Sequence, residues 1–384
     1  MLNCSKPSGT GCEGGFSTVC CLLPFGQFLQ PAILRFDQGD TDLPPFKVAL
    51  VGAEGQPVPE WVRTNLSQKK IDLLVHECAS SEELAQYAGD ADVVWVWGSR
   101  VVTADRLDVL RRCGAILRSG SGTDNVPVNE ATSLGILVAN TPEATSFEVS
   151  DHAVGLLLAV IRQISVQDRA VRQGKWSRDL GFPRWHLRGQ TLAVIGFGHI
   201  GKLFVHKMRA FDLTILVCDP VVDAALMAQH GVQRVSLDEA LSRADFVSLH
   251  CPLTKATHHL IGERELRMMK PTSVLINTSR GGLIDEAMLV RALKEGWISA
   301  AGLDVLEQQP PVPDNPLLSL DNVVITPHIA GYSDIFLEHF WRHSVETVID
   351  LAEGHWPRSC VNPEVVPRWN LSRDLAKHNH GSAL

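Results

Sequence analysis

A glycine-rich segment in the middle of the chain has the residue types and spacing that suit phosphate binding. It reads Thr191-Leu-Ala-Val-Ile-Gly196-Phe-Gly198-His-Ile-Gly201, between a short apolar run and a predicted helix over Lys202–Ala210. In this context the first glycine permits a tight turn, the second lets the backbone approach a pyrophosphate, and the third lets helix and strand pack closely. The helix start also offers free N–H groups and partial positive charge. We therefore expect a dinucleotide here, in contact with Phe197, His199 and Ile200.

An acidic residue follows at the distance this motif requires. Asp219 lies 18 residues after Gly201, at the end of a predicted strand over Thr214–Cys218. A carboxylate at this place accepts both ribose hydroxyls of NAD and repels the additional phosphate of NADP. A helix cap or a turn before Pro220 is the alternative role. We expect NAD as the cofactor.

Two polar segments follow later apolar runs. Asn277–Gly282 comes after a predicted strand over Val274–Ile276, and Thr326–Gly331 after Val323–Ile325. Arg280 can clamp a carboxylate with two parallel hydrogen bonds, and His328 can exchange a proton near neutral pH. A surface ion pair for Arg280 and a buried, hydrogen-bonded imidazole for His328 are the alternatives. Open α/β sheets bind ligands at the carboxyl ends of their strands, which favours the chemical roles.

The elements that position these residues form two sets of short apolar runs separated by helical spacing. The first set predicts a parallel α/β sheet with strands at Phe46–Val51, Ile71–Val75, Val93–Trp97, Ala115–Leu117 and Ile136–Val138. The second set predicts a doubly wound sheet of six strands, at Thr191–Ile195, Thr214–Cys218, Phe246–Leu249, Val274–Ile276, Ala300–Val305 and Val323–Ile325.

Helix signals lie between and after these runs. Thr145 and Glu148 have the spacing of a capping box before the apolar run Val149–Ile161, and Ser236 and Glu239 repeat that spacing. The stretch 285–294 is amphipathic and is followed by a glycine. A last helix carries one apolar stripe, at Leu337, Phe340, Trp341, Ser344, Val345, Val348, Ile349 and Ala352.

Composition excludes several classes of protein. The 384 residues are 45% hydrophobic and 20% charged, with a net charge of −8, which gives nucleic acid no electrostatic footprint. No apolar run approaches the roughly 20 residues that cross a bilayer, so we expect no membrane partner. The nine cysteines lack the dense spacing of a disulfide scaffold. We expect a two-domain protein of a reducing compartment, the cytoplasm.

The first 45 residues differ from the rest, with four cysteines at Cys4, Cys12, Cys20 and Cys21 and no periodicity. We expect a disordered extension. A signal peptide is an alternative, but Pro24, Gly26 and Pro31 interrupt the apolar stretch; a zinc cluster is another, but the cysteines lack paired spacing.

Over residues 46–363 the chain resembles the D-isomer-specific 2-hydroxyacid dehydrogenases. The resemblance rests on Ser119-Gly-Ser-Gly-Thr-Asp-Asn-Val126, the 196–201 loop, His250-Cys-Pro-Leu-Thr254, Asn277–Gly282, Ala301-Gly-Leu-Asp304-Val and Thr326–Gly331. It implies a flavodoxin-like substrate domain of residues 46–143 plus 332–365, an inserted Rossmann domain of 144–331, and a flexible tail of 366–384. It also implies a homodimer that pairs through the helix after Thr145.

The same resemblance implies roles for individual residues. Arg280 would bind the substrate carboxylate with help from the backbone at Ser121 and Gly122, and His328 would be the general acid–base. The cofactor would contact the glycine loop and Asp219, together with Ser121, His250, Cys251, Pro252, Thr257, Thr278, Ser279, Asp304, His328 and Gly331. No metal is expected.

One position departs from the family pattern. The family carries an acid that pairs with the catalytic histidine, two residues after a first Glu; here Glu307 matches the first acid and Gln309 stands at the catalytic position. A neutral amide orients an imidazole without stabilising its charged form. The rate and pH range are therefore expected to differ from those of a Glu-containing relative.

Three hypotheses follow. The first is an NAD-dependent D-2-hydroxyacid dehydrogenase acting on a small 2-oxo acid. The second is an NAD-regulated binding protein similar to the C-terminal-binding co-repressors of the same family, although Gly331 stands where that subgroup carries Trp. The third is another NAD enzyme, of the phosphite or formate type. The substrate itself is left open: Arg100, after the run ending at Trp97, could reach a phosphate or a second carboxylate of the substrate, or could lie on the surface.

Overall fold

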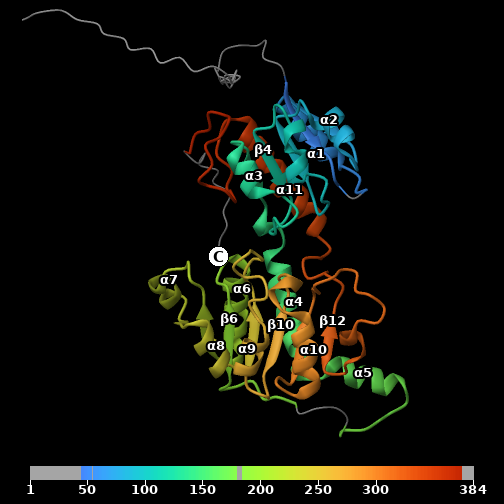
Figure 1. Cartoon of the computed structure of the whole chain (residues 1–384), viewed down its shortest axis with the longest axis vertical. Coiled ribbons are helices and arrows are strands. Elements are labelled where there is room, and N and C mark those ends of the chain that lie inside the picture. Colours follow the sequence, from blue (N-terminus) through green and yellow to red (C-terminus); the bar gives the residue numbers. More distant parts are fainter. Residues whose placement is uncertain (1–44, 54, 180–183, 374–384) are drawn as a thin grey trace, which may run out of the picture.

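The computed structural model describes residues 45–53, 55–179 and 184–373, which form two α/β units, each built on an all-parallel sheet (Figure 1). The N-terminal extension expected for residues 1–45 therefore lies outside the described residues except for its last position. Of the predicted tail, residues 374–384 lie outside them as well.

The first unit contains a five-stranded sheet in the order β2-β1-β3-β4-β5, which is the flavodoxin-like order. Its strands are β1 (Phe46–Leu50), β2 (Ile71–Val75), β3 (Val93–Val96), β4 (Ala115–Arg118) and β5 (Leu137–Asn140). Its helices are α1 (Glu60–Gln68), α2 (Ser81–Ala88) and α3 (Val128–Ser133). The central strand β3 is buried over its whole length, as expected for an apolar run covered on both faces.

The second unit contains a seven-stranded sheet in the order β12-β11-β10-β9-β6-β7-β8. Its strands are β6 (Thr191–Ile195), β7 (Thr214–Cys218), β8 (Gln233–Arg234), β9 (Phe246–Leu249), β10 (Val274–Asn277), β11 (Ala300–Leu303) and β12 (Val323–Ile325). Its flanking helices are α6 (His199–Met208), α7 (Ala224–Gln229), α8 (Leu237–Arg243), α9 (Glu263–Met268) and α10 (Glu286–Glu295). Counted from β6, the order is that of a Rossmann sheet with one further strand.

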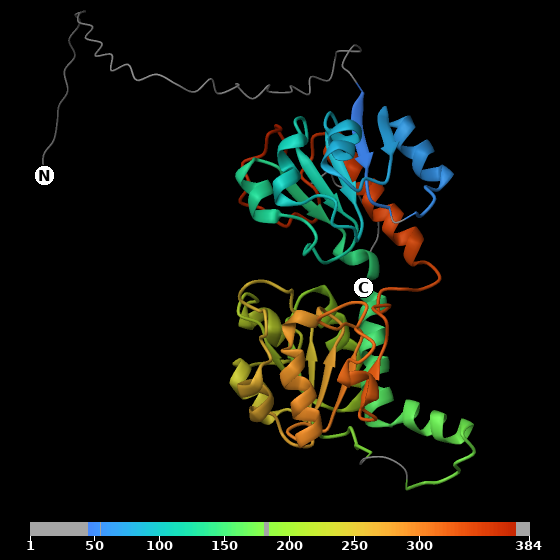
Figure 2. The same cartoon turned by 45° about the vertical axis from the view of Figure 1, so that its right-hand side comes forward.

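Two long helices connect the units (Figure 1). α4 (Ser146–Ile161) leaves the first unit and packs against β10, β11 and α6 of the second. α11 (Phe336–Ala352) returns the chain to the first unit, where Trp341 meets Trp95 with ring centroids 5.4 Å apart. The first unit is thus assembled from both ends of the described chain. α5 (Ile164–Arg172) extends away from the second unit (Figure 2).

Some local predictions differ from the structure. β8 was not expected, because Gln233 and Arg234 are polar and exposed. The predicted capping box at Thr145 and Glu148 does not form: Thr145 makes no side-chain cap, and the Glu148 carboxylate accepts a hydrogen bond from Ser333 Oγ at 3.1 Å. A 3-10 turn over Pro142–Thr145 already leads into the helix, which begins at Ser146. α6 begins at His199, three residues earlier than expected.

The chain after residue 365 packs more closely than the flexible tail predicted from 366. Trp369 is 6% exposed and lies against Gly114, where an added Cβ would come within 1.9 Å of its ring. Arg368 donates hydrogen bonds to the carbonyl oxygens of Leu134 and Cys113, at 2.6 and 3.0 Å. These contacts attach residues up to 373 to the first unit, so the predicted boundary at 366 is wrong.

One segment, Pro142–Ile161, is long and apolar enough by length and composition to cross a membrane, contrary to the sequence-based expectation. It is the connecting helix α4 with its preceding turn, and 56% of its most apolar window is buried. Since α4 packs on the sheet of the second unit, its apolar composition is that of a core helix.

Candidate active site

The carboxyl ends of the two sheets meet at a contact between Arg280 and Asp124. Arg280 follows β10 in the second unit, and Asp124 lies in the loop after β4 in the first. Arg280 Nε donates to Asp124 Oδ1 at 2.8 Å. The guanidinium also covers Gly122, where an added Cβ would lie 1.6 Å from Arg280 Nη2. The predicted carboxylate-binding residues Arg280 and Gly122 are therefore brought together.

The loop that carries Arg280 is fixed by a fully buried amide. Asn277 Nδ2 donates to the Arg280 carbonyl oxygen at 2.9 Å, while Asn277 Oδ1 accepts from the backbone N–H of Ser279 at 3.0 Å. Ser279 Oγ donates to the Leu249 carbonyl oxygen at 2.8 Å. Arg280 Nη1 donates to the Ser279 carbonyl oxygen at 2.8 Å. Together these bonds position the guanidinium.

The contact with Arg280 affects the ionisation of Asp124. Partial burial raises the pKa of this carboxyl, but the positive charge and hydrogen bond of Arg280 outweigh burial and leave the pKa below its ordinary value. Asp124 is therefore a carboxylate at neutral pH. It occupies one edge of the guanidinium and leaves Nη2 for another ligand.

His328 sits on a loop organised around one buried carboxylate. Asp304, 1% exposed, accepts hydrogen bonds from Thr326 Oγ1 at 2.6 Å and from the N–H groups of Ile329 and Ala330 at 3.0 and 2.9 Å. The His328 N–H donates to the Asp304 carbonyl oxygen at 2.8 Å, and His328 itself has a left-handed backbone with φ 56°. Asp304, predicted to lie near the cofactor, thus supports the loop that presents the imidazole.

Gln309 lies beside the imidazole, at the position predicted from the family pattern. Its Oε1 is 2.8 Å from His328 Nδ1, and its Nε2 donates to the Leu306 carbonyl oxygen at 2.9 Å. Since the amide N–H₂ is used by a carbonyl, Oε1 accepts from the ring, and Nδ1 must carry the proton. The Nε2 atom of His328 is then the atom that gains or loses a proton.

The surroundings of His328 favour its neutral form. Partial removal of water from the ring is the largest influence, and the charge of Arg280 acts in the same direction. Asp304 and Asp124 oppose them, but the pKa of His328 remains below its ordinary value of 6.5. Gln309 contributes no charge that would restore it.

The glycine loop has the three steric properties that its motif requires. Gly196 has φ 97°, and an added Cβ would lie 2.6 Å from the backbone nitrogen of Cys251. At Gly201 it would lie 2.3 Å from the Gly196 carbonyl oxygen. At Gly198, the N-cap of α6, it would meet nothing within 4 Å, so the protein leaves space beside this glycine. That space lies at a helix N-terminus without a side-chain cap, which suits a pyrophosphate.

Asp219 contacts the same loop. Its Oδ2 accepts from the Phe197 N–H at 2.8 Å, and its Oδ1 from the Val221 and Val222 N–H groups at 2.9 and 3.1 Å. Asp219 thus holds the turn at Pro220, which was the alternative role, and its contact with the ribose stays a prediction. A carboxylate has further lone pairs for two hydroxyl groups.

Two buried polar atoms at the strand ends of the second unit have no partner within the described residues. They are Thr278 Oγ1, on a residue 7% exposed, and His250 Nδ1, on a residue 9% exposed. His250 Nε2 lies 2.8 Å from Ser248 Oγ, and burial lowers the pKa of His250 to about 3. Both residues were predicted to contact the cofactor. Buried polar atoms without partners are unusual, so these atoms fit a nicotinamide dinucleotide that supplies the partner.

The remaining predicted residues border these groups. Ser121 Oγ donates to the Pro142 carbonyl oxygen at 3.2 Å, and Thr257 Oγ1 donates to the Pro252 carbonyl oxygen at 2.6 Å, closing the loop after Cys251. At Gly331 an added Cβ would lie 3.2 Å from Thr145, so a larger residue would require a shift there. The sequence analysis did not assign Asp124, although it lies within the quoted segment 119–126.

Comparisons with known proteins agree with this geometry. Residues 154–330 match the family profile of the D-isomer specific 2-hydroxyacid dehydrogenase, NAD binding domain. The chain is 38% identical over 306 residues to a glyoxylate reductase of Korarchaeum cryptofilum, covering 77% of this chain and 91% of that protein. It is 36% identical over 313 residues to a D-3-phosphoglycerate dehydrogenase of Archaeoglobus fulgidus, covering 81% of this chain but only 59% of that protein.

A solved structure extends the agreement to the fold. The D-lactate dehydrogenase of Aquifex aeolicus, complexed with NAD and lactic acid, superimposes with a TM-score of 0.71 at 29% identity, covering 80% of this chain and 96% of that one. These relatives are dehydrogenases and reductases, and they give no support to the co-repressor hypothesis. The protein is a nicotinamide-dependent oxidoreductase of 2-hydroxy or 2-oxo acids, and the chain belongs to the D-isomer specific 2-hydroxyacid dehydrogenase family.

Proposed function

We propose that this protein is an NAD-dependent D-2-hydroxyacid dehydrogenase that interconverts a small 2-oxo acid and its D-2-hydroxy acid. The observation that carries the proposal is the hydrogen bond between His328 Nδ1 and Gln309 Oε1, which leaves His328 Nε2 as a proton donor or acceptor beside Arg280. An imidazole after β12 and a guanidinium after β10, at the same edge of one parallel sheet, suit the reduction of an oxo acid.

Arg280 would bind and orient the substrate. Its Nε is used by Asp124 and its Nη1 by the Ser279 carbonyl oxygen, so Nη2, which lies over Gly122, is directed to the substrate side. The backbone N–H groups around Ser121 and Gly122 would share the substrate carboxylate. The guanidinium would also polarise the adjacent 2-oxo group.

His328 would move the proton. Bound NADH supplies the hydride that reduces the 2-oxo carbon. His328 in its protonated form would donate the Nε2 proton to the oxo oxygen, and neutral His328 would accept that proton in the oxidative direction. Gln309 would keep Nδ1 protonated in both states of the ring. The acid–base role therefore requires only one titrating nitrogen.

Asp219 supports a preference for NAD over NADP. Its carboxylate lies at the end of β7, where it already bonds the Phe197 N–H of the glycine loop, and a negative charge there repels a 2′-phosphate. We expect kcat/KM for NADH to exceed that for NADPH by at least roughly tenfold, about 1.4 kcal/mol. Equal values for the two coenzymes would contradict this role of Asp219.

The deciding experiment is a panel of 2-oxo acids assayed with NADH. Glyoxylate, pyruvate and hydroxypyruvate are the first members, and a phosphorylated oxo acid tests whether Arg100 extends the site. We expect turnover on at least one of them and its loss in His328→Asn. Tight NADH binding with negligible turnover on the whole panel would contradict the proposal.

We also propose a cytoplasmic homodimer. Apolar side chains on α4, on α5 and just after α5 are exposed in the single chain: Phe147 by 49%, Ile164 by 56%, Val171 by 47% and Trp176 by 87%. Exposed apolar groups on a projecting helix are suited to an isologous contact with a second copy (Figure 2). The five cysteines of the described residues are free thiols, which suits a reducing compartment. A monomer in sedimentation at micromolar concentration would contradict the dimer.

A further inference from the structure

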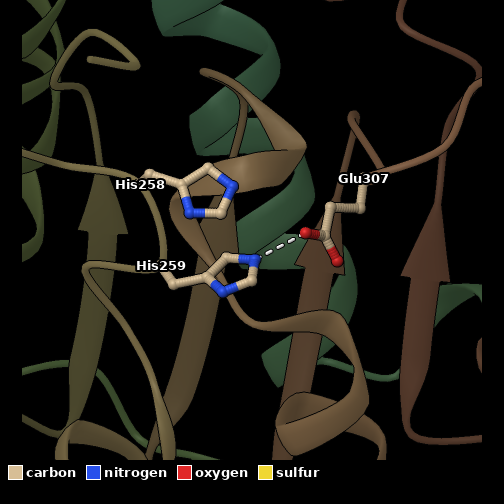
Figure 3. A group of neighbouring side chains, drawn as sticks. All are labelled: His258, His259 and Glu307. Atoms are coloured by element: carbon tan, nitrogen blue, oxygen red, sulfur yellow. Dashed lines mark hydrogen bonds and ion pairs between the residues drawn. The ribbon is translucent and has the colours of Figure 1, made fainter. Parts of the chain in front are cut away.

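A cluster of two histidines and one glutamate lies outside the catalytic groups described above. It consists of His258, His259 and Glu307, whose potential ligand atoms all lie within 4.8 Å of one another (Figure 3). His258 and His259 belong to the segment between β9 and α9, and Glu307 follows β11. Figure 3 shows the two imidazoles one above the other, with the carboxylate beside His259.

We propose that this cluster is a binding site for a divalent transition-metal ion, with Zn²⁺ as the best-matched ion. Two imidazoles and one carboxylate are ligands that Zn²⁺ accepts, and a water molecule would complete a tetrahedron. Ligand atoms about 2 Å from the metal in a tetrahedral site lie roughly 3.3 Å from one another. The closest pair here, His259 Nε2 and Glu307 Oε1, is 2.5 Å apart, and the widest separation is within 4.8 Å. Small rotations of these partly exposed side chains bring all three to metal-binding distance.

The carboxylate of Asp285 lies near the second ring nitrogen of His259. His259 Nδ1 lies 4.0 Å from Asp285 Oδ2, on the side of the ring away from Glu307. Histidines that bind a metal usually donate their other N–H to a carboxylate, which fixes the ring and its tautomer. Without metal, Nε2 carries the proton shared with Glu307; with metal at Nε2, that proton moves to Nδ1 and faces Asp285. At 4.0 Å the two atoms are not yet hydrogen-bonded, and a small movement of Asp285 would let its carboxylate accept this proton when the ion binds.

The charges around the cluster favour a cation. Asp285 and Glu307 face the two ring nitrogens of His259, and Glu286 Oε2 accepts from the Glu307 backbone N–H at 2.9 Å, so three carboxylates lie in or beside the cluster. Within the described ranges 45–53, 55–179 and 184–373, no lysine or arginine forms an ion pair with any of the three. A divalent ion would supply the missing positive charge.

The position of the site gives the ion a structural role. The backbone N–H of His259 donates to the Gly282 carbonyl oxygen at 2.8 Å. Gly281 packs so closely on Leu306 that a Cβ added to Gly281 would lie 2.0 Å from the Leu306 carbonyl oxygen. An ion held by His259 and Glu307 would tie the loop after β9 to the loop that continues to Gln309. This inference does not depend on the proposed substrate or cofactor preference.

The test is a titration of the full chain, first stripped with a chelator, with Zn²⁺ alone by calorimetry. We expect one binding event to be lost in His258→Ala and in Glu307→Gln, with affinity at least about hundredfold lower. Asp285→Asn keeps an N-cap for α10 but removes the negative charge that faces His259 Nδ1, so affinity should fall roughly tenfold. The matched control is His206→Ala, on the exposed side of α6.

A second readout does not depend on activity. Cobalt(II) in place of zinc should give visible absorption bands in the wild type and in His206→Ala, but not in His258→Ala. Zn²⁺ should also raise the Tm of the wild type relative to chelator, and this rise should disappear in Glu307→Gln. Binding with the same stoichiometry and affinity in the wild type, His258→Ala and Glu307→Gln would overturn the proposal, because the ion would then be held elsewhere.

Discussion

The imidazole Nδ1 of His328 lies 2.8 Å from Oε1 of Gln309, and no carboxylate occupies that position. Glu307, the nearest acid in sequence, turns away and contacts His259 instead. The catalytic imidazole is thus oriented by a neutral dipole whose other end is held by the Leu306 carbonyl oxygen. Gln309 therefore orients the ring without adding the negative charge that a glutamate would place there.

Replacing the amide by an acid should shift the pH profile. The pKa of His328 is lowered, so the protonated donor is lost at lower pH, and kcat/KM for reduction should fall early as pH rises. Gln309→Glu places a negative charge beside Nδ1 and raises this pKa, which extends reduction to higher pH. Oxidation, which needs the neutral ring, should change in the opposite sense. The measurement is kcat/KM against pH in both directions, and superimposable profiles would show that Gln309 does not control the titration.

Two glycines of one motif should respond differently to the same substitution. Gly198→Ala adds a Cβ into open space, so the Tm without cofactor should stay unchanged while NADH binds at least roughly tenfold more weakly. Gly201→Ala places its Cβ 2.3 Å from the Gly196 carbonyl oxygen, so the fold itself should lose stability. Thermal unfolding and NADH titration of both variants test the distinction. Wild-type NADH affinity in Gly198→Ala would show that the pyrophosphate does not bind at this turn.

A lysine at position 280 should not support the activity that Arg280 supports. The guanidinium makes separate hydrogen bonds to Asp124 and to the Ser279 carbonyl oxygen and still presents Nη2 toward Gly122. A single ammonium group cannot reproduce this fork, so Arg280→Lys should lower kcat/KM by about hundredfold. NADH affinity serves as the control, because no proposed cofactor contact is removed. An unchanged kcat/KM would place the substrate carboxylate elsewhere.

The buried imidazole of His250 should make the protein sensitive to acid. Its pKa is 6.5 when exposed and about 3 in the folded protein, because burial disfavours the charged ring. Below pH 6.5 the unfolded chain takes up a proton that the folded chain does not, so stability falls as pH falls, by about 1.4 kcal/mol per pH unit. Between about pH 7 and pH 5, His250→Gln should lose about 2 kcal/mol less than the wild type in denaturant unfolding without cofactor. Parallel losses would show that other groups carry the acid response.

Most strands could be predicted because short, continuous apolar runs are typical of buried parallel strands, and the order of motifs identified the Rossmann unit. Strand β8 was not predicted, because Gln233 and Arg234 are polar and form no apolar run. Trp369 was assigned to a tail because the residues that bury it, among them Phe46 and Gly114, lie far away in sequence. The Thr145–Glu148 spacing predicted a capping box that does not form. A short local pattern does not show that the Glu148 side chain contacts Ser333, which is distant in sequence.

Some contacts of the candidate site could also be predicted from the sequence, and others could not. Gln309 and His328 were paired through a family pattern that already contains the contact. The bond between Arg280 and Asp124 joins residues 156 positions apart, in two different units, and no spacing rule connects them. The contact between His259 and Glu307 likewise spans 48 positions and follows from the register of β9, β10 and β11 rather than from either segment alone.

The return of α11 to the first unit sets an order for assembly during synthesis. The apolar cluster around β1, β3, β4 and β5 includes Trp341, Val345, Val348 and Leu351, which all lie on that last helix. The ribosome therefore releases every strand of the second unit before the first unit can close its core. A nascent chain that stops before residue 336 holds a complete dinucleotide fold joined to a half-covered sheet. The substrate-binding half becomes competent last, although its first strand is the earliest to be made.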